Sequence, residues 1–113
     1  MSEDKKSLFL NRWNMLAVGY RPPQQEYGFD KCIGRKHRFD FAWVEYHIAV
    51  EVNGNAWQTK GGGRHGSDSD LEKMNIAASR GWRVFQFSPS MLNNDPVGCI
   101  DIIKNCIDEI ERE

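Results

Sequence analysis

The sequence lacks several features that would place the chain outside the aqueous interior of a cell. None of its apolar runs approaches the roughly 20 residues that span a membrane. Its first six residues, Met-Ser-Glu-Asp-Lys-Lys, lack the apolar core of a secretory leader. Its three cysteines cannot form a full set of disulfides, and no two of them have the short spacing of a zinc motif. We therefore expect a cytoplasmic protein with no membrane partner.

An excess of positive charge is also missing. The formal net charge is −1, so bulk charge does not indicate a nucleic-acid-binding protein. The charge is unevenly distributed, however. Residues 20–83 hold ten basic and eight acidic side chains and sum to +2, whereas residues 84–113 hold two basic and six acidic ones and sum to −4. The middle of the chain is therefore its most basic part, with basic residues crowded just before Asp40.

The chain has enough apolar residues to build one compact core. It has 113 residues, of which 40% are hydrophobic and 12% aromatic, and it contains no internal repeat. A chain of this length suits one domain. We expect that domain to span residues 1–113, with no linker that would divide it.

The hydrophobic periodicity predicts alternating helices and strands. Helices are expected at 7–17, 69–80 and 97–111, with a short helical turn opening at Ser88-Pro89-Ser90, and strands at 24–29, 39–44, 47–52 and 82–87. In the second helix Ser69 is the expected N-cap, and the apolar stripe is expected to hold Leu71, Met74, Ala77 and Ala78. The stripe of the last helix is expected to hold Cys99, Ile103, Cys106, Ile107 and Ile110. Gly81 stands where a helix C-terminus favours glycine. The order is α-β-β-β-α-β-α. We expect an α/β fold with a mixed sheet flanked by helices.

The most informative stretch is 39–54, which has the pattern of a hairpin. With Glu45 and Tyr46 in the turn, Asp40 falls directly opposite Glu51. One face is then wholly apolar and carries Phe39, Phe41, Trp43, Ile48, Val50 and Val52. Like charges directly opposite each other destabilise a sheet, so something must compensate the two acids.

A divalent cation is the expected compensation. Carboxylate oxygens suit Mg²⁺ or Mn²⁺. Asp40 and Glu51 would be the anchoring ligands, and the backbone carbonyl of Val52 could supply a third oxygen. The alternative is a solvent-exposed edge with two unrelated carboxylates. Glu26, on the preceding predicted strand, is either a further member of the acidic cluster or a surface glutamate.

These motifs, in this order, resemble the PD-(D/E)XK nuclease superfamily, and more closely the small bacterial and phage endonucleases related to very-short-patch repair enzymes. The segments that carry the resemblance are Arg38-Phe39-Asp40-Phe41-Ala42, Ala49-Val50-Glu51-Val52-Asn53-Gly54, Lys73 and Gly81-Trp82-Arg83-Val84. The resemblance implies a restriction-endonuclease-like αβββαβ core, here with an added C-terminal helix. It also implies that Asp40 is the motif aspartate and Glu51 the acid of the (D/E)XK triplet.

The resemblance also exposes a departure, because the lysine of the triplet falls at Asn53. Either another basic residue has taken over its role or the chain is a non-catalytic relative. Lys73 is one catalytic candidate, the alternative being a solvated helix lysine. His65, in a glycine-rich loop, is the other, the alternative being an exposed loop histidine. Nucleic-acid contacts are expected from Lys36, Arg38, Asn53 and Arg64.

The sequence thus predicts a metal-dependent DNA endonuclease that uses a metal-activated water. The first alternative is a non-catalytic nucleic-acid-binding domain, and the second is a partner-recruiting domain that kept the nuclease fold. A chain of 113 residues offers little surface for reading sequence. We therefore expect either a homodimer or recognition of DNA structure.

Overall fold

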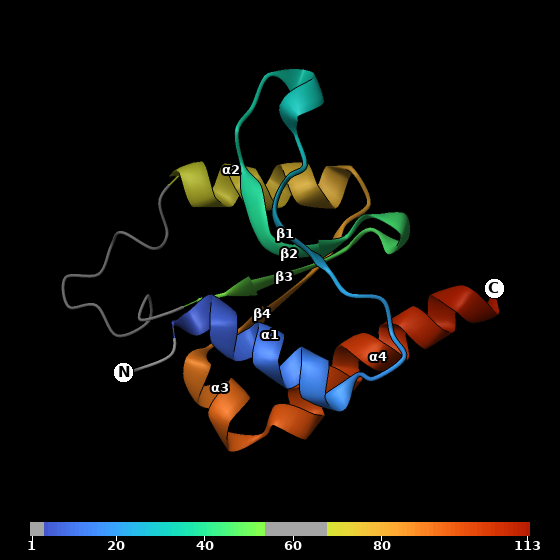
Figure 1. Cartoon of the computed structure of the whole chain (residues 1–113). Helices are drawn as coiled ribbons and strands as arrows, with labels where there is room; N and C mark the ends of the chain where they lie inside the picture. The colour runs from blue at the N-terminus through green and yellow to red at the C-terminus, as the bar shows by residue number, and fades with distance from the viewer. Residues whose placement is uncertain (1–3, 54–67) are drawn as a thin grey trace.

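A computed structural model describes residues 4–53 and 68–113 (Figure 1). Its elements, in chain order, are α1 (Lys5–Leu16), β1 (Gln24–Gly28), the 3₁₀ turn η1 (Lys31–Ile33), β2 (Arg38–Trp43), the 3₁₀ turn η2 (Val44–Tyr46), β3 (Ile48–Val52), α2 (Asp68–Ser79), β4 (Arg83–Phe87), α3 (Pro89–Asn94) and α4 (Pro96–Arg112). The predicted element order is confirmed, and the short helical turn expected from Ser88-Pro89-Ser90 is helix α3. No helix in these two ranges is long and apolar enough to cross a membrane.

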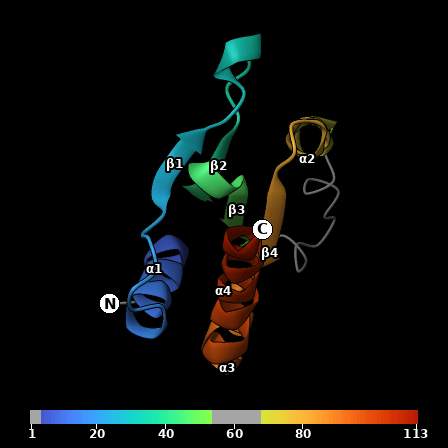
Figure 2. The same ribbon diagram turned by 90° about the vertical axis from the view of Figure 1, so that its right-hand side faces the viewer.

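The four strands form one mixed sheet, as predicted. Their order is β1-β2-β3-β4. β2 pairs antiparallel with both β1 and β3, whereas β3 pairs parallel with β4. Helix α2 makes the crossover between the two parallel strands and lies over one face of the sheet, while α1, α3 and α4 cover the other face (Figures 1 and 2). The fold therefore has three layers, with the ends of β2 and β3 between helices.

The main core lies between the sheet and helices α1, α3 and α4. It is rich in aromatic rings, among them Phe9, Trp13, Phe41 and Trp43, which are almost fully buried. The predicted stripe of α4 is confirmed, because Cys99, Ile103 and Ile107 are buried at helical spacing. This core packs against one face of β2 and β3, so the strand ends that carry the polar residues are held rigidly.

The predicted hairpin register is confirmed, but the predicted composition of its apolar face is wrong at Phe39. Phe41 pairs with Val50, Ala42 with Ala49 and Trp43 with Ile48. Phe39, however, does not share the face of Phe41. It packs on the α2 side, with ring centroids 4.0 Å from Phe29 and 5.0 Å from Trp82.

The regular alternation fails because both neighbouring strands are irregular at the same position. Glu26, which falls opposite Asp40 between the paired residues of β1 and β2, has a left-handed φ of 53°. The pairing of β2 with β3 is recorded only as far as Phe41 and Val50. Beyond that point side chains, not the backbone ladder, join the two strands. The simple period of two therefore cannot hold at Asp40.

Helix α2 is rotated relative to the prediction. It begins at Asp68, before the predicted N-cap Ser69, and Leu71 is exposed although we expected it in the buried stripe. Ala77 of the predicted stripe is fully buried, as expected, whereas Ala78 is exposed like Leu71. This rotation places Lys73 on the side of the helix that faces the sheet, where it pairs with Glu51.

The end of α2 follows the prediction closely. Gly81 has a left-handed φ of 82°, its N–H donates to Ala78 O, and the N–H of Trp82 donates to Ala77 O at 3.0 Å. These two bonds form a Schellman motif, which glycine favours because it has no Cβ. The motif turns the chain directly into β4 and brings Trp82 beneath α2.

Candidate functional site

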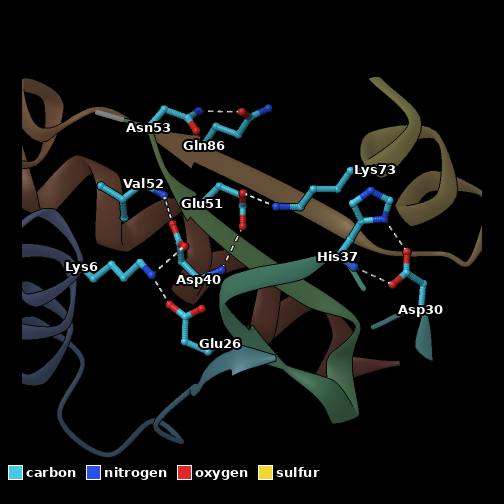
Figure 3. A network of polar contacts seen from close by, with 10 residues as sticks. All are labelled: Lys6, Glu26, Asp30, His37, Asp40, Glu51, Val52, Asn53, Lys73 and Gln86. Carbon is cyan, nitrogen blue, oxygen red and sulfur yellow. Dashed lines mark hydrogen bonds and ion pairs between the residues drawn. The ribbon is translucent and has the colours of Figure 1, made fainter. Parts of the chain in front are cut away.

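Asp40 and Glu51 join the ends of β2 and β3 by reciprocal hydrogen bonds. The backbone N–H of Asp40 donates to Glu51 Oε2 at 2.9 Å, and the N–H of Val52 donates to Asp40 Oδ2 at 2.8 Å (Figure 3). Each carboxylate thus accepts from the backbone of the opposite strand. The predicted proximity of the two acids is confirmed, although each carboxylate bonds to a backbone N–H of the opposite strand, that of Asp40 or of Val52.

Two lysines from opposite layers compensate the acids. Lys73 Nζ of α2 lies 2.6 Å from Glu51 Oε1, and Lys6 Nζ of α1 lies 3.6 Å from Asp40 Oδ1. Lys6 also pairs with Glu26 of β1. Figure 3 shows the two ammonium groups on either side of the carboxylates. The compensation that we expected from a cation is supplied here by protein, with three acids against two lysines.

Burial perturbs Glu51. The side chains of Asp40, Glu51 and Lys73 are 19%, 14% and 18% exposed. Loss of solvent raises the pKa of Glu51 above its usual range, while the ion pair with Lys73 lowers it in part. Protons therefore compete for Glu51 at a higher pH than for an exposed glutamate. Cation binding at this carboxylate should weaken as the pH falls through that raised pKa.

Replacement of Lys73 by methionine is expected to raise the pKa of Glu51 further. The substitution keeps most of the aliphatic stem but removes the ammonium group that favours the charged carboxylate. A ¹³C NMR titration of the Glu51 side-chain carboxyl measures this directly. Lys104→Met, on α4, is the control and should leave the titration unchanged. A midpoint that stays in place or falls in Lys73→Met would contradict the assignment of Lys73 as the main charge partner.

The ligand atoms are of the type that a hard divalent cation prefers, although only two carboxylates supply them. Two carboxylates held within one hydrogen-bonded unit present oxygen ligands of the type that Mg²⁺ and Mn²⁺ prefer. Within residues 4–53 and 68–113 no group of three or more His, Cys, Asp or Glu side chains could hold a metal. Val52 contributes its N–H to Asp40, and the role of its carbonyl as a ligand stays a prediction.

Asn53, at the position of the missing lysine, is held by β4. Its side-chain Nδ2 donates to Gln86 Oε1 at 2.7 Å, and its backbone N–H donates to Phe87 O at 2.9 Å. The amide is thus part of the sheet's polar edge beside Glu51. The positive charge beside Glu51 belongs to Lys73 of α2.

The structure describes two of the other predicted nucleic-acid contacts, Lys36 and Arg38, and both lie near the start of β2. Lys36, just before β2, and Arg38, its first residue, are exposed and have no ion-pair partner in the described part of the chain. His65 and Arg64 lie outside the described residues, so their predicted roles stay predictions. The structure therefore brings together Asp40, Glu51 and Lys73 and places Asn53 at the edge of that group.

Sequence reasoning missed two polar groups. Lys6 gave no signal, because its role depends on how α1 packs across the sheet edge. The second is Asp30, which is fully buried and lies 2.7 Å from His37 Nδ1 through its Oδ2. The sequence indicated this pair only by placing an acid and a histidine at the two ends of a short basic turn.

The comparisons with known proteins agree with the fold. No protein-family model matches the sequence, and no curated protein sequence matches it significantly. Among solved structures, the chain is similar to the catalytic domain of the homing endonuclease I-Bth0305I, with a TM-score of 0.60 and 19% sequence identity. The match covers 96% of this chain and 94% of that domain. At this identity the similarity establishes a shared nuclease-like α/β fold.

Proposed function

We propose that the chain is a metal-dependent DNA endonuclease of the PD-(D/E)XK type, related to very-short-patch repair endonucleases. The observation that carries the proposal is the pair of reciprocally bonded carboxylates with Lys73 Nζ 2.6 Å from Glu51. Two acids and a lysine on adjoining elements are the groups that phosphodiester hydrolysis uses. The likeness to a homing endonuclease catalytic domain, which extends over nearly the whole chain, supports the same reading.

Asp40 and Glu51 would hold Mg²⁺ or Mn²⁺, with the carbonyl of Val52 as a predicted third ligand. When bound, the ion supplies an activated water and neutralises charge on the phosphate. The chain's own groups do the positioning. The backbone N–H groups of Asp40 and Val52 orient the two carboxylates, and the partial burial of Glu51 limits competing water.

Lys73 takes the place of the triplet lysine in this proposal. Its ammonium group enters from α2 beside Glu51, and Nζ lies over the ring of Phe39, 5.8 Å from the ring centroid. A fixed positive charge here stabilises the charge that develops on the phosphate oxygens during attack. His65 remains the predicted proton acceptor for the attacking water, and Asn53 and Arg64 remain predicted DNA contacts.

Lys73→Met is expected to lower the rate of plasmid nicking by about 10²-fold, the scale at which loss of one charge-stabilising donor acts. The same variant should bind Mn²⁺ at least as tightly as the unmodified chain at pH 8, because an ammonium group that competes for Glu51 is gone. Nicking of supercoiled plasmid and Mn²⁺ titration by electron paramagnetic resonance measure the two effects. An unchanged nicking rate would assign Lys73 a structural role alone.

A non-catalytic DNA-binding domain is the second candidate. Asn53, bonded to Gln86, stands in place of the triplet lysine, and this observation favours loss of catalysis. Incubation with supercoiled plasmid and Mg²⁺ or Mn²⁺ separates the candidates. Nicking that requires the metal supports the endonuclease. DNA binding without nicking under either metal supports the second candidate, and absence of both would leave a partner-recruiting domain.

A further inference from the structure

The segment that joins β1 to β2 forms a projecting arm, which we define as residues 30–38. It contains the 3₁₀ turn η1 and rises past α2, away from the sheet (Figures 1 and 2). Its sequence holds four basic residues and one acid. Neither the carboxylate pair nor the core requires a basic extension of this length.

A buried acid fixes the shape of the arm. Asp30 is 0% exposed, and its Oδ1 and Oδ2 accept from the backbone N–H and from Nδ1 of His37, at 3.0 and 2.7 Å. Its carbonyl oxygen accepts from the N–H groups of Ile33 and Arg35, at 3.2 and 3.1 Å. Asp30, at one end of the arm, thus bonds to the middle of the turn and to His37 near the other end. These bonds preorganise the arm.

Two side-chain contacts also fasten the arm to α2 and to the residue that follows its end. Arg35 Nη2 lies 2.5 Å from Glu72 Oε2, and Arg80 Nη2 donates to Cys32 Sγ at 3.1 Å. The ion pair with Glu72 occupies Arg35. The arm is therefore positioned relative to Lys73 of the same helix, and so relative to the carboxylate pair.

The outer surface of the arm has the chemistry of a DNA-binding element. Lys31, Lys36 and Arg38 are exposed and have no ion-pair partner in the part of the chain that the structure describes. Between the two lysines, at the tip, Ile33 is 50% exposed. Unpaired cations bind phosphates, and an apolar side chain flanked by them is the arrangement that inserts into a minor groove.

We propose that this arm grips duplex DNA next to the cleavage site, with Lys31 and Lys36 on phosphates and Ile33 in the minor groove. The inference rests on the proposed nuclease function and adds the substrate surface. Lys36 precedes Asp40 by four residues, or about 13 Å along an extended strand. That distance is about four base pairs of duplex. Asp30 and His37 are positioning residues in this proposal.

Fluorescence anisotropy with a labelled A·T-rich duplex, in EDTA and at 50–200 mM NaCl, tests the arm without cleavage. Ile33→Ser is expected to weaken binding about tenfold, from the loss of one buried apolar contact. Ile102→Ser is the matched control, because Ile102 is 49% exposed and lies on α4 in the opposite layer. Netropsin, which fills the minor groove of such a duplex, should compete with the unmodified chain.

Removal of the two lysines should change the salt dependence of DNA binding. Lys31→Gln with Lys36→Gln is expected to reduce the slope of log K against log salt by about 1.8, since each phosphate contact contributes about 0.9. Arg112→Gln, at the far end of α4, should leave the slope unchanged. Ile33→Ser should weaken binding without changing the slope, because it removes no charge.

The positioning role is tested by pairing two variants. His37→Phe removes the donor to Asp30 and is expected to raise KM for duplex with kcat unchanged, whereas His37→Asn restores a donor and should restore KM. If Ile33→Ser and the double lysine variant bind like the unmodified chain, which itself binds and nicks DNA, the arm proposal fails and the nuclease stands. If the unmodified chain binds no DNA, both fail.

Discussion

Plasmid nicking is expected to fall at least about 10³-fold when Asp40 is replaced by asparagine, on the scale seen when single catalytic groups are removed. The substitution is nearly isosteric and retains an oxygen that can accept from the N–H of Val52. It removes the negative charge that a divalent cation requires. Glu51→Gln should act similarly, because its amide oxygen can still accept from the N–H of Asp40.

Thermal unfolding distinguishes loss of chemistry from loss of fold. Both variants should unfold near the temperature of the unmodified chain, because each keeps a side-chain oxygen that accepts from the backbone N–H of the opposite strand. Asp101→Asn is the matched control, since that exposed carboxylate lies on α4 and pairs only with Lys104 among the described residues. Equal nicking by Asp40→Asn, Glu51→Gln and the unmodified chain would remove the carboxylate pair from the mechanism.

Truncation of Trp43 to alanine is expected to cost about 3–5 kcal/mol of the free energy of unfolding. Its ring is 1% exposed and lies 4.8 Å from the ring of Trp13, centroid to centroid. Its Nε1–H donates to Arg21 O at 2.9 Å, so truncation also leaves that carbonyl without its partner. Single domains have about 5–15 kcal/mol in total, so the variant should be close to unfolding. Urea denaturation followed by circular dichroism measures the change.

A pair of milder variants isolates the hydrogen bond. Trp43→Phe loses the bond to Arg21, whereas the buried Nε1 of Trp13 has no acceptor among the described residues. Trp43→Phe should therefore cost roughly 1 kcal/mol more than Trp13→Phe. An equal or reversed order would show that ring packing alone sets the contribution of Trp43.

The parts of the fold that were predictable from sequence are those governed by local periodicity. The hairpin register followed from strict alternation and a short turn, and it holds at Phe41, Ala42 and Trp43. The end of α2 followed from the conformational freedom of Gly81. Phe39 could not be placed, because the left-handed φ of Glu26 on the neighbouring strand breaks the alternation.

The site was partly predictable for a similar reason. Asp40 and Glu51 are neighbours because the register sets them opposite each other, which sequence can reveal. The predicted stripe of α2 was wrong at Leu71, which is exposed, because Lys73 and Ala77 face the sheet in its place. Lys6 and Asp30 depend on contacts between distant elements, which no local pattern encodes.

The reciprocal bonds between the two carboxylates and the opposite backbone have an evolutionary consequence. The side chains proposed for catalysis also complete the pairing of β2 and β3, so selection for folding acts on them even where cleavage is no longer needed. A descendant that lost activity should therefore have Asn or Gln at positions 40 and 51, where an acceptor is kept, and not Ala or Val. In lineages with this fold, a preserved acceptor at positions 40 and 51 is therefore weak evidence that cleavage is retained.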